Sequence, residues 1–222
     1  NIVASVNNNI HNKILKMLRP IDIKSNIDWK GIQDYYVMRG KEHDFLNRTP
    51  EQIRAGHDQY HFRCVRKKYG HGEDQNSWEL FACLDGASLR SWHIHLAPTY
   101  RKFVPWITQF LKDYPQFDNP GFTTSYAEIS GDVLPHDDLE SSYTKLNIIE
   151  TGHPEDYTWI DKGNKISKHY HVPGSAYLVD SKYSHGAVVK HDFKFLQIGF
   201  KRQPFEEVSE ALPKSLDYSK IN

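Results

Sequence analysis

The second half of the sequence is a succession of short strand-like segments, each bounded by Gly, Pro, Asp or Asn. They cover residues 122–130, 144–150, 157–160, 165–172, 176–179, 186–190 and 193–202. No helical pattern long enough to connect parallel strands separates them, so antiparallel pairing is predicted. Such a series hides its strand edges best by closing into a jelly roll or barrel. The predicted fold class is therefore mainly β with flanking helices.

The first half predicts three helices that flank this core. Apolar residues recur at helical spacing between residues 10 and 18, and Pro20 would end that helix. Residues 49–52 (TPEQ) have the composition of a helix start, with an N-cap threonine and a proline at the first helical position. That helix is predicted to run to about Tyr69, where its basic last turn complements the helix dipole. A third helix, at residues 104–114, is expected to pack on the outside of a sheet.

Two further strands are predicted at residues 78–84 and 92–96. The second of them places His93 and His95 on one face, which makes an alternative metal-binding pair, although no third ligand lies nearby in the sequence. A pair of surface or hydrogen-bonded histidines explains this pattern better.

Length and composition predict one domain over residues 1–222, with flanking elements in 1–121, the β core in 122–202 and a C-terminal tail in 203–222 that lies across the surface. Lys and Arg total 28 and Asp and Glu total 28, so no overall basic field attracts nucleic acid or an anionic membrane. Only two cysteines occur, far apart, and no apolar run approaches the length of a membrane helix. We expect a soluble, cytoplasmic protein without nucleic-acid or membrane partners, and its oligomeric state stays open.

The candidate chemistry lies in the stretch DVLPHDDL at residues 132–139, which follows a strand and a turn at Gly131. His136 and Asp138 stand two residues apart, and such residues on an extended backbone point to the same side. A third candidate ligand, His185, precedes a late strand. Two imidazoles and one carboxylate on one face of a metal form the facial triad of non-haem Fe(II) oxygenases. His136, Asp138 and His185 are therefore predicted to bind one metal ion.

Three polar residues on the strands are candidates for binding a small acid. Alternation along the last strand puts Lys194 on the same face as apolar residues, where an unpaired charge is costly. Lys194 is therefore predicted to receive a carboxylate, although a lysine that reaches water from the strand end is the alternative. Lys145 and Asn147 share one face of their strand and could meet the other end of the acid, while Leu146 and Ile148 pack away. Ordinary solvated positions explain Lys145 and Asn147 almost as well.

The combined pattern resembles Fe(II)/2-oxoglutarate-dependent oxygenases. The matching stretches are SYAEISGDVLPHDD at residues 125–138, KLN at 145–147, GSAYLVDSKYSH at 174–185 and FKF at 193–195. Within that superfamily the sequence is most similar to the aspartyl/asparaginyl β-hydroxylase-like branch, although that branch usually has Arg where Lys194 and Lys145 stand. The resemblance spans residues 122–202 and implies a double-stranded β-helix, the jelly roll of cupins.

The resemblance also implies the reaction and its ligands. Fe(II) would be bound by His136, Asp138 and His185, and 2-oxoglutarate by Lys194, Lys145, Asn147 and Tyr126. With dioxygen, such enzymes convert 2-oxoglutarate to succinate and CO₂ and hydroxylate a C–H bond. Because Asp138 fills the third ligand position, hydroxylation is favoured over halogenation. The substrate would be a small molecule or an amino-acid side chain.

Residues that contact the substrate are harder to assign. The candidates are Tyr126, Tyr143, Trp159, Tyr170 and Arg202, and packing within the barrel explains each of them equally well. Two other functions stay open at this point. One is a cupin-type metalloenzyme that does not use 2-oxoglutarate, and the other is a non-catalytic β-barrel binding module whose histidines are structural.

Overall fold

The structure is a computed structural model of the whole chain. It describes residues 17–42, 62–68, 78–85, 90–96, 99–138, 144–163, 165–201 and 203–221. Within these ranges it describes the backbone alone at residues 38–42, 62–68, 78–85, 90–95 and 134.

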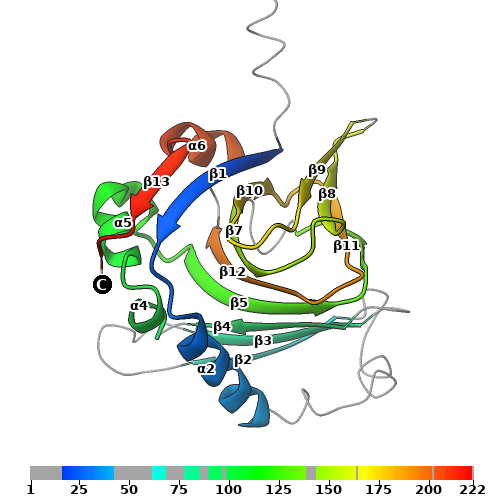
Figure 1. Cartoon of the computed structure of the whole chain (residues 1–222), viewed down its shortest axis with the longest axis horizontal. Helices are drawn as coiled ribbons and strands as arrows, with labels where there is room; N and C mark the ends of the chain where they lie inside the picture. The colour runs from blue at the N-terminus through cyan, green and yellow to red at the C-terminus, as the bar shows by residue number, and fades with distance from the viewer. Residues whose placement is uncertain are drawn as a thin grey trace, which may run out of the picture.

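Two sheets make up the β structure (Figure 1). The larger sheet has nine strands in the order β13 (Ser215–Tyr218), β1 (Leu18–Ser25), β10 (Ala176–Asp180), β7 (Thr144–Thr151), β12 (Phe193–Phe200), β5 (Phe122–Ser130), β4 (Arg90–His95), β3 (Trp78–Asp85) and β2 (Phe62–Lys68). The smaller sheet has four strands in the order β6 (Val133–His136), β11 (Ser184–Val188), β8 (Tyr157–Asp161) and β9 (Ile166–Tyr170).

The strand order is that of a double-stranded β-helix. Strands β5, β12, β7 and β10 are neighbours in the large sheet, and β6, β11, β8 and β9 form the small one. Along the chain, β5 is followed by β6 in the other sheet, β7 by β8, β9 by β10 and β11 by β12. All these core pairs are antiparallel. The jelly-roll fold class predicted from the strand series is therefore confirmed.

The two faces of the large sheet bury different clusters because side chains alternate along each strand. On β7, Ile149 belongs to the apolar cluster between the two sheets. Leu146 and Ile148 point the other way and pack with the helices on the outer face, as predicted. Both faces of β7 are thus buried, so an apolar neighbourhood alone does not identify the face that lines the barrel interior.

Within the described residues, four helices and a short 3-10 turn accompany the sheets. They are α2 (Trp29–Glu42), α4 (Tyr100–Phe103), α5 (Ile107–Asp113), η3 (Pro115–Phe117) and α6 (Phe205–Ala211). In α5 the stripe of Ile107, Phe110 and Leu111 is buried, and Trp106 at its start is also fully buried. The helix predicted at 104–114 therefore exists and packs on the outside of the sheet, although it begins later because the chain turns at residues 104–106 after α4. No described helix is long and apolar enough to cross a membrane.

One helix prediction in the first half is wrong. Phe62–Lys68, expected in the helix that ends near Tyr69, is strand β2 and pairs antiparallel with β3. The helix prediction rested on local signals, namely the N-cap and the basic run, whereas pairing with β3 decides the structure. Charged residues also suit a strand at the edge of a sheet. Residues 49–61 lie outside the described part of the chain.

The helix predicted over residues 10–18 lies almost entirely outside the described residues. Residues 10–16 are not described, but Leu18–Ser25 is strand β1. Pro20 is accommodated because β13 pairs with β1 only from Asp22 onwards, so one edge of β1 is open at the proline. Helix α2 was not predicted; its signal is Asp28, whose side chain accepts a hydrogen bond from the backbone N–H of Gly31 at 2.9 Å.

The C-terminal residues do more than lie across the surface. Helix α6 buries Phe205 and Val208, and β13 pairs with β1 in the one parallel pair among the described strands. Leu216 and Tyr218 of β13 join the outer cluster, and the Tyr218 ring stacks on Trp106 at 5.3 Å. The tail therefore completes the outer layer of the fold.

Candidate metal centre

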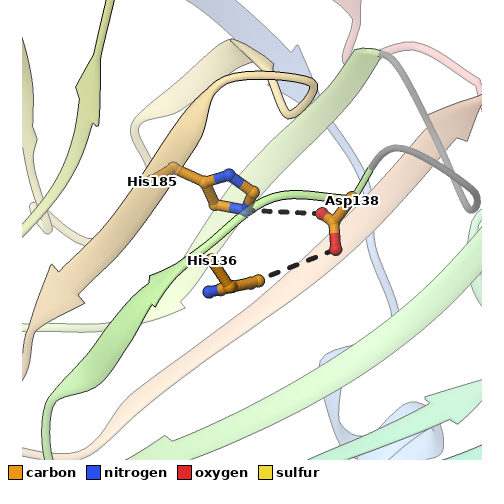
Figure 2. Close-up of side chains that lie close together, drawn as sticks. All are labelled: His136, Asp138 and His185. Carbon is orange, nitrogen blue, oxygen red and sulfur yellow. Dashed lines mark ion pairs between the residues drawn. The ribbon is translucent and has the colours of Figure 1, made fainter. Parts of the chain in front are cut away.

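His136, Asp138 and His185 converge at one end of the barrel (Figure 2). Their candidate ligand atoms all lie within 4.8 Å of one another. The His185 Nε2 to Asp138 Oδ2 distance is 3.3 Å and the His136 Nε2 to Asp138 Oδ1 distance is 4.0 Å. The two imidazole rings lie 4.3 Å apart between centroids and are tilted by 50°. Two residues close in sequence and one far along the chain thus form a single donor set.

Strand pairing brings the two histidines together. In the small sheet His185 of β11 is directly opposite His136, the last residue of β6. Gly131 has a φ of 87°, in the left-handed region that favours glycine, and lets the chain turn from β5 into β6. Two residues after His136, the backbone N–H of Asp138 donates to the carbonyl of Ser181 at 2.9 Å. That bond ties the Asp138 backbone to the loop that precedes β11.

The hydrogen bond of His185 leaves its outer nitrogen available to a metal. The Nδ1 of His185 lies 2.8 Å from the carbonyl oxygen of Tyr183. A carbonyl can only accept, so Nδ1 carries the proton and the lone pair is on Nε2, the atom that faces Asp138. This arrangement, in which a backbone carbonyl fixes the tautomer of a ligand, is usual around protein-bound metals.

Asp138 is ionised in this setting. Burial alone would raise the pKa of its carboxyl, but the charge of the Lys145 ammonium outweighs burial and holds the pKa well below its usual range. The ammonium of Lys145 forms an ion pair with Asp138 Oδ2. The side chains of Lys145 and Asp138 are 16% and 17% exposed, so the pair is largely removed from water. A positive charge therefore already lies where the donor set would hold a cation.

A cavity opens beside the three ligands, between the two sheets. Its apolar walls come from residues on both sheets, namely Ile129, Val133, Val179, Ala187, Phe193 and Phe195. Among the described residues that line the cavity, Lys145 is the one lysine or arginine.

A chain of hydrogen bonds forms the polar side of this cavity. Gln197 donates to Asn147 at 3.1 Å, and Asn147 donates to the hydroxyl of Tyr177 at 3.0 Å. The Tyr177 hydroxyl lies 2.8 Å from that of Thr158, and Thr158 lies 2.9 Å from Nε2 of His171. Of the five, only Gln197 is not buried. The cavity is thus apolar on its walls and polar at defined points, as ligand sites in proteins usually are.

Lys145 and Asn147 lie in this cavity, whereas Lys194 and Tyr126 do not. Lys194 is on the same face of β12 as Leu196 and Ile198, as predicted, but this is the outer face of the large sheet. Its ammonium pairs with Glu128 on the neighbouring strand at 3.4 Å. Lys194 was placed wrongly because the outer face of the large sheet is also apolar. Apolar neighbours therefore did not identify the face that lines the barrel interior.

Tyr126 is on the outer face as well. It is 1% exposed and donates a hydrogen bond to Glu150 at 2.6 Å, and its ring lies 5.3 Å from that of Tyr36. Burial, together with the Glu150 carboxylate, raises its pKa far above the usual value. Tyr126 is therefore a neutral packing residue with a satisfied hydroxyl.

The other substrate candidates lie away from the cavity or outside the description. Tyr170 is 51% exposed, and Trp159 packs where a side chain on Gly186 would stand. Neither residue lines the cavity. Tyr143 and Arg202 lie outside the described residues, as do the side chains of His93 and His95, whose strand β4 is present.

Three polar residues that line the cavity were not predicted from the sequence, namely Gln197, Thr158 and Tyr177. A signal existed for Gln197, because it lies on the face opposite to Lys194 and pairs directly with Asn147 on β7. Thr158 and Tyr177 carry no such signal, since hydroxyl-bearing residues are common on any strand.

Among the comparisons with known proteins, the comparison with solved structures found similar chains. No protein-family model and no curated protein matches the sequence. Among solved structures, a cupin superfamily protein from Desulfitobacterium hafniense is 20% identical over 38% of this chain and 71% of its own, with a TM-score of 0.27. An oxidoreductase of the 2OG-Fe(II) oxygenase family from Burkholderia pseudomallei is 9% identical over 53% of this chain and 70% of its own, with a TM-score of 0.39.

A third similar structure is a mutant of oxalate decarboxylase from Bacillus subtilis, which is 7% identical over 55% of this chain and 28% of its own, with a TM-score of 0.35. Identities and scores at this level are low. The assignment of the fold therefore rests on the strand order, and any function rests on this chain's own residues.

Proposed function

We propose that this protein is a non-haem Fe(II)/2-oxoglutarate-dependent dioxygenase that hydroxylates a C–H bond of a small molecule or an amino-acid side chain. The observation that carries the proposal is the donor set of His136, Asp138 and His185 beside a cavity between the sheets. Two imidazoles and one carboxylate on one side of an ion leave its other side open, which is the ligand set of this class of enzyme.

The donor set fits a divalent metal in three respects. The 3.3 Å between His185 Nε2 and Asp138 Oδ2 is slightly longer than the separation of about 2.8–3.1 Å expected for neighbouring ligands of an octahedral ion at metal bonds of about 2.0–2.2 Å, so a small movement closes the site. The Nε2 of His185 is the unprotonated nitrogen, and Asp138 is ionised. When bound, the iron would supply the redox chemistry with dioxygen, and the chain would supply position and charge.

Lys145 is the residue we assign to a carboxylate of 2-oxoglutarate. In this structure its ammonium neutralises Asp138. A dication bound by Asp138 would take over that role, because it carries twice the charge of the ammonium and the attraction scales with that charge. Lys145 would then be repelled by the ion and free to pair with an incoming acid, while Asn147 and Gln197 offer amide hydrogen bonds on the same side of the cavity.

The apolar walls have a separate task. Phe193, Phe195 and Val179 exclude water from the cavity, and low polarity strengthens the pairing of Lys145 with an acid. The methylene groups of a five-carbon diacid also suit such walls. Hydroxylation additionally requires that the substrate's C–H bond approach the open side of the ion, and the described residues leave the identity of that substrate open.

Anaerobic titration tests the proposal. Addition of Fe(II) and then 2-oxoglutarate to the metal-free protein is expected to give a weak visible charge-transfer band, and His185→Ala and Asp138→Ala are expected to abolish it. Succinate formation in air should follow the same pattern. Iron binding without a band or succinate would indicate a cupin-type metalloenzyme that does not use 2-oxoglutarate, and the absence of stoichiometric metal would indicate a binding module.

A pair of lysine variants makes the test sharper. Lys145→Ala should weaken binding of 2-oxoglutarate far more than binding of the metal. Lys194→Ala is the matched control, because Lys194 is a lysine on a neighbouring strand that lies on the other face of the sheet and pairs with Glu128. An equal loss in both variants would contradict the assignment of Lys145, and a loss in Lys194→Ala alone would restore the role first predicted for Lys194.

A further inference from the structure

A second group of possible metal ligands lies outside the centre described above. It consists of His153, Asp156 and His191, whose candidate ligand atoms all lie within 4.8 Å of one another. His191 Nδ1 is 3.2 Å from Asp156 Oδ2, and the His153 and His191 rings stack at 3.8 Å with a tilt of 27°. None of the three residues lines the cavity beside the first centre.

The two groups lie at opposite ends of the barrel. Lys145 is near the start of β7, whereas His153 and Asp156 follow the end of that strand. His185 is likewise near the start of β11, whereas His191 follows its end. Since a strand advances about 3.3 Å per residue, these strands separate the groups by well over the reach of a shared ion.

Asp156 is an unusual residue for the end of a barrel. It is 0% exposed, and its Oδ1 forms no well-aligned hydrogen bond with any described residue. Its Oδ2 accepts from the backbone N–H of His191 at 2.9 Å. This fully buried carboxylate thus has one oxygen without a well-aligned hydrogen bond from the described residues.

We propose that His153, Asp156 and His191 form a second metal site that binds Zn²⁺. Ligands about 2.0–2.1 Å from a tetrahedral zinc ion lie about 3.3 Å apart, close to the 3.2 Å between His191 Nδ1 and Asp156 Oδ2. The ion replaces the proton that these two atoms share. His153 supplies the third ligand, and water completes the coordination.

Such an ion would add a link between two turns that the hydrogen bond from the His191 backbone N–H to Asp156 already joins. His153 and Asp156 are in the turn from β7 to β8, which joins the two sheets, and His191 is in the turn from β11 to β12, which also joins them. Bound zinc would therefore close the end of the barrel that lies opposite the open metal centre. This site is structural in character and does not depend on the proposed oxygenase activity.

The test uses untagged protein whose first centre is disabled by His136→Ala and His185→Ala. Calorimetric titration of this metal-free double variant with Zn²⁺ at micromolar concentration should give one equivalent bound and raise its Tm by several degrees. Adding His191→Ala should abolish both effects, and so should adding His153→Ala. His191 is the safer of the two for folding, because its side chain is 46% exposed.

Matched controls are the neighbouring exposed carboxylates, Glu155→Gln and Asp192→Asn, which should leave zinc binding unchanged. Cobalt(II) in place of zinc should give the strong visible absorption of a tetrahedral site in the double variant and lose it with His191→Ala. The proposal is overturned if the double variant binds no zinc, if bound zinc survives both histidine substitutions, or if the control variants lose it equally.

Discussion

Replacement of Lys145 by methionine tests the electrostatics of the metal centre. In the metal-free protein this change leaves the ionised, 17% exposed carboxylate of Asp138 without its ammonium partner. Loss of one partner from a fully buried ion pair costs about 3–5 kcal/mol. Because water still reaches part of both side chains, we expect a loss of about 2–4 kcal/mol in the free energy of unfolding. For a chain of this length that lowers Tm by roughly 4–16 °C.

Metal should rescue this variant. A divalent ion bound by Asp138 replaces the missing positive charge, so the gap in Tm between Lys145→Met and wild type should shrink when Mn²⁺ or Co²⁺ is added to chelator-treated protein. The assay is thermal and urea unfolding with and without metal. Lys194→Met is the control: its pair with Glu128 is more exposed and should contribute less than about 1 kcal/mol. The reasoning is refuted if Lys145→Met loses no more stability than Lys194→Met, or if metal leaves the gap unchanged.

Three other changes probe the surroundings of the centre. Gly186→Ala would bring a methyl group within 2.6 Å of the Val133 carbonyl oxygen, so it should cost about 1–3 kcal/mol in urea unfolding and weaken metal binding by moving His185 away from His136. Gly174 has a φ of 80°, and a Cβ placed on it would meet nothing within 4 Å, so Gly174→Ala should cost about 1–2 kcal/mol in the free energy of unfolding and leave metal affinity intact. Equal metal affinities of Gly186→Ala and Gly174→Ala would contradict this. Tyr177→Phe removes the acceptor of Asn147 and should cost about 1–3 kcal/mol in the same assay, whereas an unchanged urea midpoint would mean that water replaces the hydroxyl. Burial lowers the pKa of His171 to about 3, so on acidification the unfolded chain binds its proton first, near pH 6.5, and stability falls by up to about 1.4 kcal/mol per pH unit between those values. His171→Gln cannot be protonated and should flatten the loss of stability measured between pH 6.5 and pH 4.5; an unchanged slope would place the titration elsewhere.

The sequence predicted the core of the fold well because its signals there are local. Strand-length segments separated by turn residues correspond to β5 and to β7 through β12, and β5 matches its predicted bounds. The candidate metal ligands could also be identified from the sequence, since His136 and Asp138 differ by two residues on extended backbone and His185 stands at a strand start. Their convergence depends on the pairing of β6 with β11, which the jelly roll imposes.

What failed depends on contacts between distant residues. The segment Phe62–Lys68 has helix-like charge placement, yet it pairs with β3 in a sheet. Lys194 shows the limit of strand alternation. The pattern correctly separated the two faces of β12, but both faces of the large sheet are apolar because the helices cover the outer one. The cavity lies on the face that the small sheet covers, and the sequence of β12 does not indicate which face that is.

A crystal structure of the protein with Mn²⁺ and 2-oxoglutarate, grown without oxygen and with the metal located by its anomalous scattering, tests the central claim most directly. It should show one ion about 2.0–2.2 Å from His136 Nε2, from an oxygen of Asp138 and from His185 Nε2. The diacid should bind on the open side of that ion, with the Lys145 ammonium moved from Asp138 to a carboxylate. Manganese bound elsewhere, or at these three residues with the diacid absent and Lys145 still paired with Asp138, would contradict it.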